Sequence, residues 1–203
     1  MSRRFDSRTS SFDQEGRLLQ VEYAMEAINQ AGSAIGVLTS AGIILATQKQ
    51  TVSALLEQSK QSEKIFALDK HLYCVVSGVT ADANYLIDYA RLSGQQYRFA
   101  FRDIQPIDQF IQNICDLKQR YTQIGGIRPF GAAFLYAGHD HESGYQLYSS
   151  DPSGNYVGWK AKAIGNNNEA ANSYLKEKYK TDITFDDGLD LAVQTLGKAL
   201  TSN

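Results

Sequence analysis

Two blocks of short apolar segments, each followed by two helical patterns, limit the folds open to this sequence more than any other feature. The first block runs SAIGVL, GIILAT, TVSALL, KIFAL and LYCVVSG, and the second runs FGAAFLYAG, GYQLYSS and GWKAKAIG. Each segment is rich in Val, Ile or Leu or in aromatic residues and is bounded by Gly, Lys or a polar turn, as strands are. Several are apolar on consecutive residues, which is typical of strands in sheets that are covered on both faces.

Helical periodicity follows each block. After the first block, one helix is predicted to begin after Thr80, with apolar positions at Leu86, Ala90 and Tyr97. A second begins near Pro106, a favourable first-turn residue, with Phe110, Ile114, Leu117 and Tyr121. After the second block, helices are predicted over 167–179 and 186–200, the last with Leu189, Val193, Leu196 and Leu200. Two facing sheets with helices outside both would bury every apolar face, so we predict an α+β fold, a four-layer αββα sandwich.

One further helix stands outside this scheme. The segment EGRLLQVEYAMEAI, residues 15–28, carries one narrow apolar stripe at Leu18, Val21, Met25 and Ile28. Asp13 is the candidate residue for its start and Gly32 for its end. Burial of such side chains contributes about 1.5–3 kcal/mol each, so the stripe should have a partner. It packs either on its own domain or partly against a neighbouring subunit, and the sequence leaves both open.

Composition limits the classes of function and the locations that this sequence suggests. The 203 residues suit one domain, over 15–203, preceded by a flexible polar arm at 1–14. The net charge of −2 gives no sign of a nucleic-acid surface. Cys74 and Cys115 lack a C-x-x-C spacing, which favours a reducing compartment. No apolar run reaches the ~20 residues that span a membrane. Asp6 and the missing apolar face argue against a targeting peptide at the N-terminus.

Five segments resemble those of the alpha subunits of the 20S proteasome, in the same order and at the same spacing. They are GRLLQVEYAMEAI, SEKIFAL, SGVTADAN, GGIRPFG and SDPSGNYVGWKAKAIG, and the resemblance extends over essentially the whole chain. It implies the sandwich of N-terminal-nucleophile hydrolases, with the extra helix on the outer face of a ring. It also implies a seven-membered ring with other alpha subunits, beta subunits beneath, and C-terminal tails of activators or regulatory particles as partners. A cytoplasmic and nuclear role in ubiquitin-dependent degradation is expected, without cofactor, metal, nucleic acid or membrane.

The catalytic members of this fold use an N-terminal threonine whose own amine serves as the base. Alignment on SAGIILATQKQ puts Gly32 at the position of that threonine and Gln48 at that of the catalytic aspartate, while Lys64 is retained. Glycine has no hydroxyl, and the adjacent Ser33 is in mid-chain without a free amine. The sequence therefore predicts a non-catalytic subunit. The alternatives are a hydrolase cut before Ser33 and a stand-alone adaptor of the same fold.

The resemblance implies two binding roles. The residues that match the family's pocket for an activator tail are Lys64, Gly78 and Val79, with Gly16 and Glu22 near the penultimate residue of the tail. The residues that match the family's gate cluster are Phe5, Asp6, Gln14 and Tyr23. In the family these are Tyr, Asp, Pro and Tyr, so Phe5 lacks a hydroxyl and Gln14 lacks the rigidity of proline. Both departures weaken the expected open-gate contacts and favour a contribution to the closed state.

Three other motifs have simpler explanations. His139 and His141 in GHDHESG could share a metal, but the Gly-flanked polar context favours a hairpin tip. Ser153 in DPSGN fits a turn, and GGIRPFG leads into a strand rather than opening a helix, so it lacks the usual anion site. The family continues past the last helix with two strands and a helix, whereas this sequence stops at KALTSN. Either the sequence is incomplete or the subunit is unusually short. Because a sheet without those strands would expose an unpaired edge, we expect missing C-terminal residues rather than a different fold.

Overall fold

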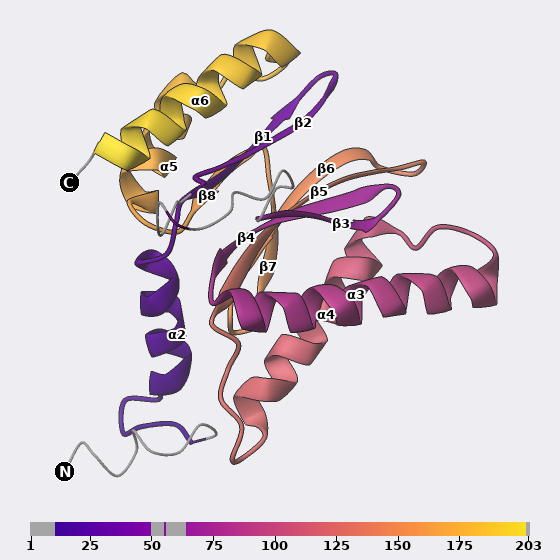
Figure 1. Ribbon diagram of the computed structural model, residues 1–203, viewed down its shortest axis with the longest axis vertical. Coiled ribbons are helices and arrows are strands. Elements are labelled where there is room, and N and C mark those ends of the chain that lie inside the picture. The colour runs from indigo at the N-terminus through magenta and orange to yellow at the C-terminus, as the bar shows by residue number, and fades with distance from the viewer. Residues whose placement is uncertain (1–10, 50–54, 56–63, 202–203) are drawn as a thin grey trace.

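The computed structural model describes residues 11–49, 55 and 64–201, and this part contains five helices and eight strands (Figure 1). In chain order they are α2 (Leu19–Asn29), β1 (Ala34–Thr39), β2 (Gly42–Thr47), β3 (Ile65–Asp69), β4 (Leu72–Gly78), α3 (Thr80–Phe101), α4 (Ile107–Gln123), β5 (Ala132–Asp140), β6 (Gly144–Ser150), β7 (Tyr156–Trp159), β8 (Ala161–Ile164), α5 (Asn168–Lys178) and α6 (Phe185–Thr201).

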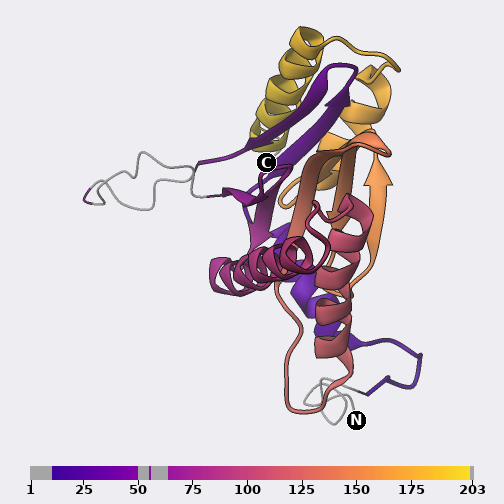
Figure 2. The ribbon, with the colours of Figure 1, turned by 90° about the vertical axis from the view of Figure 1, so that its right-hand side faces the viewer.

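The strands form two antiparallel sheets that pack face to face, as Figures 1 and 2 show. The smaller sheet has the order β2-β1-β8, and the larger has the order β3-β4-β5-β6-β7. Helices α5 and α6 cover the outer face of the smaller sheet, and α3 and α4 cover that of the larger one. The predicted four-layer αββα sandwich is confirmed.

The strand β4 shows why the apolar runs are continuous. Cys74 and Val76 point toward α3 and α4, whereas Val75 between them points toward the smaller sheet. All three are at most 6% exposed, because successive side chains of a strand lie on opposite faces and both faces are covered here. The middle of such a strand is therefore apolar on consecutive residues.

Helix α2 lies beside one end of the sandwich, against β4 and β5 (Figure 1). Its residue Ile28 is 5% exposed and joins the core between the sheets, whereas Met25 on the predicted stripe is 43% exposed. The helix begins at Leu19 and ends at Asn29, so Gly32 does not end it. The Asp13 carboxylate accepts hydrogen bonds from backbone N–H groups within the preceding turn rather than from the helix. Part of the stripe therefore packs on its own domain, whereas Met25 does not.

The apolar face predicted for α6 is wrong. The side chains of Leu189, Val193 and Leu200 are 45%, 60% and 44% exposed, and Leu196 is partly buried. The face that meets the smaller sheet is formed by Gly188, Leu191, Ala192, Thr195 and Ala199. A β-carbon on Gly188 would collide with Thr39 of β1. Close approach of helix and sheet therefore selects small residues on the inner face.

Two boundaries differ from the sequence predictions, and one predicted strand is not tested. The segment GWKAKAIG is two strands in different sheets, because β7 ends at Trp159 and β8 begins at Ala161. The residue between them, Lys160, accepts a hydrogen bond of 2.8 Å from the Leu38 N–H of β1. Pro106 precedes α4 instead of standing in its first turn. The predicted strand TVSALL falls almost entirely outside the described residues.

Among the described residues the smaller sheet has two edge strands, β2 and β8, and each pairs with β1 alone. No helix in the ranges that the structure describes combines the length and apolarity needed to cross a membrane.

Candidate functional site

Four chain segments meet at one end of the sandwich, around Gly32. This glycine precedes β1, and Gln48 follows β2, whose residue Thr47 pairs with Ala34 of β1. Lys64 precedes β3, and its carbonyl accepts a hydrogen bond of 3.1 Å from the Val76 N–H near the end of β4. The strand register therefore brings together residues that are far apart in the sequence.

The backbone at Gly32 is held firmly. Its carbonyl accepts a hydrogen bond of 2.9 Å from the Ser77 hydroxyl. Gly165, with φ of +89°, packs so closely that a β-carbon there would lie 2.6 Å from the Gly32 oxygen. The Asn166 N–H donates to the Ala31 carbonyl at 2.8 Å. The position of residue 32 is thus fixed by neighbours on both sides.

Lys64 and Gln48 converge on Gly32. A β-carbon built on Gly32 would collide with the Lys64 Nζ and would lie 3.8 Å from the Gln48 Oε1. The three residues predicted from the catalytic pattern therefore do lie together, and we call them the Gly32 site. Its chemistry is that of a cation and an amide, with no hydroxyl at the nucleophile's position.

Ser33 cannot take over as the nucleophile. The residue is 2% exposed, and its hydroxyl donates a hydrogen bond of 2.8 Å to the Asn166 carbonyl. Its own carbonyl accepts from the Thr47 hydroxyl at 3.1 Å and the Gln48 N–H at 3.2 Å. The side chain is buried and engaged, and its nitrogen belongs to a peptide bond.

The predicted pocket residues Gly78 and Val79 lie beside the Gly32 site, at the end of β4. Gly78 has a φ of +125°, and a β-carbon there would collide with the Gly131 carbonyl. Only glycine fits this close crossing of two strands. The Val79 N–H donates to the same carbonyl at 2.8 Å, so it is already engaged within the chain. The Val79 side chain is 43% exposed at the start of α3.

The other two predicted pocket residues, Gly16 and Glu22, lie toward the opposite end of α2. Gly16, with φ of +78°, closes a turn through its N–H to the Asp13 carbonyl at 3.2 Å. Glu22 pairs with Arg17, whose Nε donates to it at 2.7 Å, and this bond lowers the pKa of the Glu22 carboxyl. The eleven residues of α2 rise about 15 Å. Within one chain the predicted pocket therefore forms two separate groups.

The predicted gate residues are only partly described. Phe5 and Asp6 lie outside the described residues. Gln14 is exposed in the turn before α2, and Tyr23 is 50% exposed on that helix. The two described members therefore lie on or beside the first two turns of α2, on the side from which the arm at 1–14 departs.

The remaining motifs lie at or beside turns. His139 is the penultimate residue of β5 and packs on Tyr145 of β6, with ring centroids 4.7 Å apart. The centroid of the His141 ring is 6.5 Å from that of His139. Among the described residues, no group of three His, Cys, Asp or Glu side chains could hold a metal. Ser153 N–H and hydroxyl both bind the Asp151 carboxylate within the predicted turn.

The GGIRPFG loop is clamped to the start of α3. Two guanidinium nitrogens of Arg128 donate to the Asp82 carboxylate at 2.6 and 2.8 Å, and the Gly131 N–H donates to it at 2.8 Å. The bonds from Arg128 lower the pKa of the Asp82 carboxyl. The conformation of the loop is therefore held by hydrogen bonds to Asp82, and Arg128 has a structural role in it.

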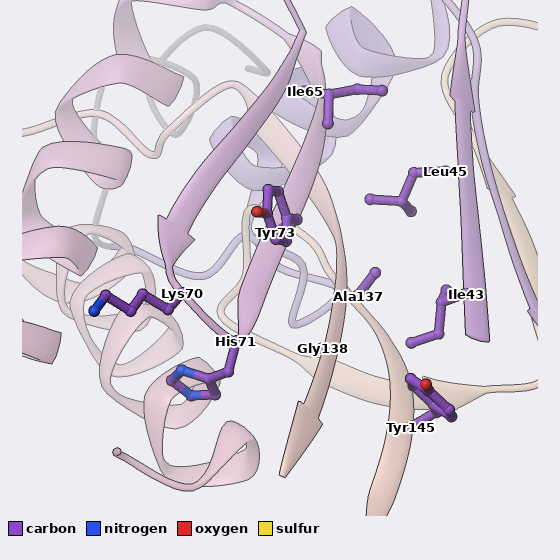
Figure 3. A pocket seen from close by; sticks show the side chains of 9 residues that line it. All are labelled: Ile43, Leu45, Ile65, Lys70, His71, Tyr73, Ala137, Gly138 and Tyr145. Atoms are coloured by element: carbon purple, nitrogen blue, oxygen red, sulfur yellow. The ribbon is translucent and has the colours of Figure 1, made fainter. Parts of the chain in front are cut away.

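An apolar cavity of about 320 Å³ opens between the sheets. Figure 3 shows Ile43 and Leu45 of β2 facing Tyr73 and Ala137 of the larger sheet, while Lys70 points away from the gap. The cavity lies toward the hairpin ends of the strands, away from Gly32. Its lining offers no acid and base in contact, so it gives no support to a catalytic role.

Sequence reasoning missed a buried cation, Lys118 of α4. The side chain is 0% exposed and donates to the Ala132 carbonyl at 3.1 Å and the Ser150 hydroxyl at 2.8 Å. Its Nζ also lies 4.6 Å from the centre of the Phe134 ring. Burial lowers the pKa of Lys118 to about 8. The spacing of four from Ile114 was the available signal, because that position falls on the buried face.

Comparison with known proteins gives matches over the whole length. The family described as "Proteasome subunit" matches residues 28–203, and the N-terminal signature of the A-type proteasome subunits matches residues 5–27. The chain is 54% identical to the alpha type-4 proteasome subunit of Spinacia oleracea and 53% identical to the alpha type-4-A one of Arabidopsis thaliana, covering 100% of this chain and 81% of each relative. It is 52% identical to the probable alpha type-3 proteasome subunit of Schizosaccharomyces pombe, covering 82% of that relative.

Proposed function

This chain belongs to the family of proteasome alpha subunits, and we propose that it serves the outer ring as a docking surface for activators and as part of the gate for substrates. Alpha subunits are the non-catalytic ring components of the 20S core, and they assemble with other proteasome subunits. The alternative of a hydrolase cut before Ser33 is therefore wrong. A stand-alone adaptor is also disfavoured, because membership implies assembly.

We further propose a place in a seven-membered ring, at its third position, above a ring of beta subunits. The similarity to relatives named alpha type-4 supports the position. Exposed apolar side chains on α3 support a partner there, since Leu92, Phe99 and Phe101 are 59%, 89% and 66% exposed. Scattered apolar residues are normal on a surface, but three on one part of one helix favour an interface. The proposed cytoplasmic and nuclear location rests on the family alone.

The docking proposal rests on one observation, the Lys64 ammonium at Gly32. The structure records no ion pair between Lys64 and any described residue. Lys64 is half-buried, and its ammonium group lies beside Gly32, which has no side chain. Such a cation is suited to bind an incoming carboxylate. The free C-terminus of an activator tail supplies that group. Gly78 and Val79, on the adjacent strand end, would shape the wall of the pocket.

Gly16 and Glu22 enter this proposal through the neighbouring subunit. Because they lie toward the far end of α2 from Lys64, one short tail cannot readily reach both groups of one chain. A pocket at the boundary between two subunits joins the Lys64 end of one to the Gly16 turn of the next. This arrangement also gives the exposed side of α2, with Met25, a neighbour to cover it.

The docking role is tested with Lys64→Ala in the assembled particle. A charge-assisted hydrogen bond contributes about 1.5–3 kcal/mol, so we expect binding of activator tails at this subunit to weaken roughly 10- to 100-fold. Lys70→Ala, an exposed lysine at the opposite end of β3, is the matched control. Unchanged cross-linking of a photoreactive tail peptide to the Lys64→Ala subunit would show the docking assignment to be wrong.

The gate role assigns residues 1–14 to a segment that covers the ring's centre. The turn at Asp13–Gly16 anchors it, since the Asp13 carboxylate binds the N–H groups of Glu15 and Arg17 at 2.9 and 2.8 Å. Deletion of residues 2–12 should raise the hydrolysis of small peptides by particles without activator. Equal basal hydrolysis in deleted and intact particles would remove this chain from the gate.

A further inference from the structure

Gly78 and Val79, at the end of β4, both contact one residue of the GGIRPFG loop, Gly131. The Val79 N–H donates to the Gly131 carbonyl at 2.8 Å, and a β-carbon on Gly78 would collide with the same carbonyl. The Gly131 N–H donates in turn to the Asp82 carboxylate at 2.8 Å. Val79 directly precedes α3, and Asp82 lies in the first turn of that helix. The start of α3 therefore holds both backbone polar groups of Gly131.

The two hydrogen-bond partners of Asp82 lie in different surroundings. Asp82 is 8% exposed and Gly131 is buried, whereas the Arg128 side chain is 63% exposed. An exposed cation contributes little to an ion pair, because water screens the charge. A buried N–H that loses its acceptor is costly, because water does not replace the lost partner. The position of Gly131 therefore depends more on the carboxylate oxygen than on the charge of Arg128.

A displacement of Gly131 would extend through the backbone to the residues proposed for docking. Gly78 pairs with Ala132 in the register of β4 and β5. The residue before Gly78 is Ser77, whose hydroxyl donates to the Gly32 carbonyl at 2.9 Å. Binding groups must be held within about 0.5 Å of their productive geometry. Loss of the bond to Gly131 should therefore impair the pocket even though Lys64 is still present.

We propose that Asp82 is a positioning residue of the activator pocket. Its carboxylate holds Gly131, and Gly131 holds Gly78 and Val79 in the place where they line the pocket. This inference rests on the docking function proposed above and deepens it, because it names a residue that controls the affinity for the tail without touching it. The oxygens of Asp82 are occupied by the Gly131 N–H and the Arg128 guanidinium.

Substitution separates the two interactions of the Asp82 side chain. Asp82→Asn keeps an oxygen that accepts from the Gly131 N–H, but it loses the charge that pairs with Arg128. Asp82→Ala loses both interactions. Arg128→Met keeps the carboxylate and loses only the ion pair. If the acceptor oxygen positions the pocket, the asparagine and methionine variants bind a tail as the wild type does, and the alanine variant does not.

The test uses assembled particles and a photoreactive synthetic peptide copied from an activator C-terminus, and it measures cross-linking to this subunit against peptide concentration. Asp82→Ala should raise the half-saturating concentration about 10-fold, because a buried N–H has lost its acceptor. Asp82→Asn and Arg128→Met should stay within about threefold of the wild type. Asp88→Ala is the matched control, because Asp88 is exposed on the same helix and pairs with Arg91 at 3.8 Å. This control should bind as the wild type does.

Thermal unfolding of each particle separates positioning from stability. Asp82→Asn, Asp82→Ala and Arg128→Met all remove the same ion pair, so all three should lower the unfolding temperature. If tail binding falls in step with that temperature across the three variants, Asp82 acts through stability alone and the inference is wrong. Normal binding by Asp82→Ala would also overturn it. So would a loss of about 10-fold in Arg128→Met, a comparison that holds even if the alanine variant does not assemble.

The variant Lys64→Ala distinguishes failure of this inference from failure of the docking function. If Lys64→Ala weakens cross-linking while Asp82→Ala does not, Asp82 has no part in positioning and the docking function stands. If Lys64→Ala binds normally, the docking function is wrong and this inference is wrong with it.

Discussion

Lys118 provides the sharpest test of the energetics of this fold, because it is a buried cation without a carboxylate partner among the described residues. Burial lowers its pKa from 10.5 to about 8 in the folded chain. Each pKa unit corresponds to about 1.4 kcal/mol, so holding this side chain in the core costs about 3 kcal/mol at neutral pH. The cost is fully present below pH 8 and is relieved as the pH rises toward 10.5, since the unfolded chain then binds more protons.

The substitution Lys118→Met keeps a long apolar side chain and removes the charge. It also leaves the Ala132 carbonyl without its donor, which offsets about 1–3 kcal/mol of the gain. This offset does not depend on pH, so it does not affect how the difference in unfolding free energy between the wild type and Lys118→Met changes with pH. Between pH 7 and pH 9 the stabilising effect of methionine on the free energy of unfolding should shrink by about 1.3 kcal/mol, because the wild type recovers part of its cost.

The assay is urea denaturation of the purified chain at pH 7, 8 and 9, with equal slopes required for comparison. Higher pH is avoided, because burial raises the pKa of Cys115 to about 11 and of Cys74 to about 12, and these thiols begin to ionise in the unfolded chain near pH 9. Lys160→Met removes an exposed lysine as the control. Parallel curves for the wild type and Lys118→Met from pH 7 to 9 would refute the reasoning.

Two other predictions concern packing and the GGIRPFG loop. Gly188→Ala should lower the free energy of unfolding by about 1–2 kcal/mol, because its β-carbon would collide with Thr39. Gly197→Ala on the same helix should raise it by up to about 1 kcal/mol. Equal effects of the two changes in urea denaturation would contradict the packing argument. Asp82→Asn should cost about 1.5 kcal/mol at pH 7, discounted because Arg128 is 63% exposed. The low pKa of Asp82 stabilises the fold above pH 3.8 and ceases to do so as the pH falls through its folded pKa, so the difference from Asp82→Asn should vanish in acid; a constant difference would exclude the ion pair as its source.

The layers of the fold were accessible from the sequence because the strands are buried on both faces. Continuous apolar runs such as LYCVVSG leave little choice of structure, and the helical spacing of Phe110 and Ile114 correctly placed the inner face of α4. The face of α6 was not accessible in this way. Large side chains such as Val193 dominate a hydrophobic pattern, but the contact with β1 depends on how near the helix can come, which small residues decide.

The candidate site was predictable to a different degree at each residue. Lys64, Gly32 and Gln48 could be grouped by alignment to the catalytic pattern, and the strand register brings them together. The separation of Gly16 from Lys64 could not be foreseen, because a list of pocket residues carries no information on which chain supplies each one. Lys118 was missed since lysine reads as a surface residue, although its spacing marked it as buried.

The step from β7 to β8 has a mechanical consequence. One residue, Lys160, carries the chain from the larger sheet to the smaller one, and the Leu38 N–H fastens it from β1. A one-residue connection cannot lengthen when the two sheets move apart. Because β7 and β8 are joined by this one residue, moving either sheet relative to the other would pull on a strand of the second sheet. We therefore expect both sheets to unfold in a single event under a stretching force.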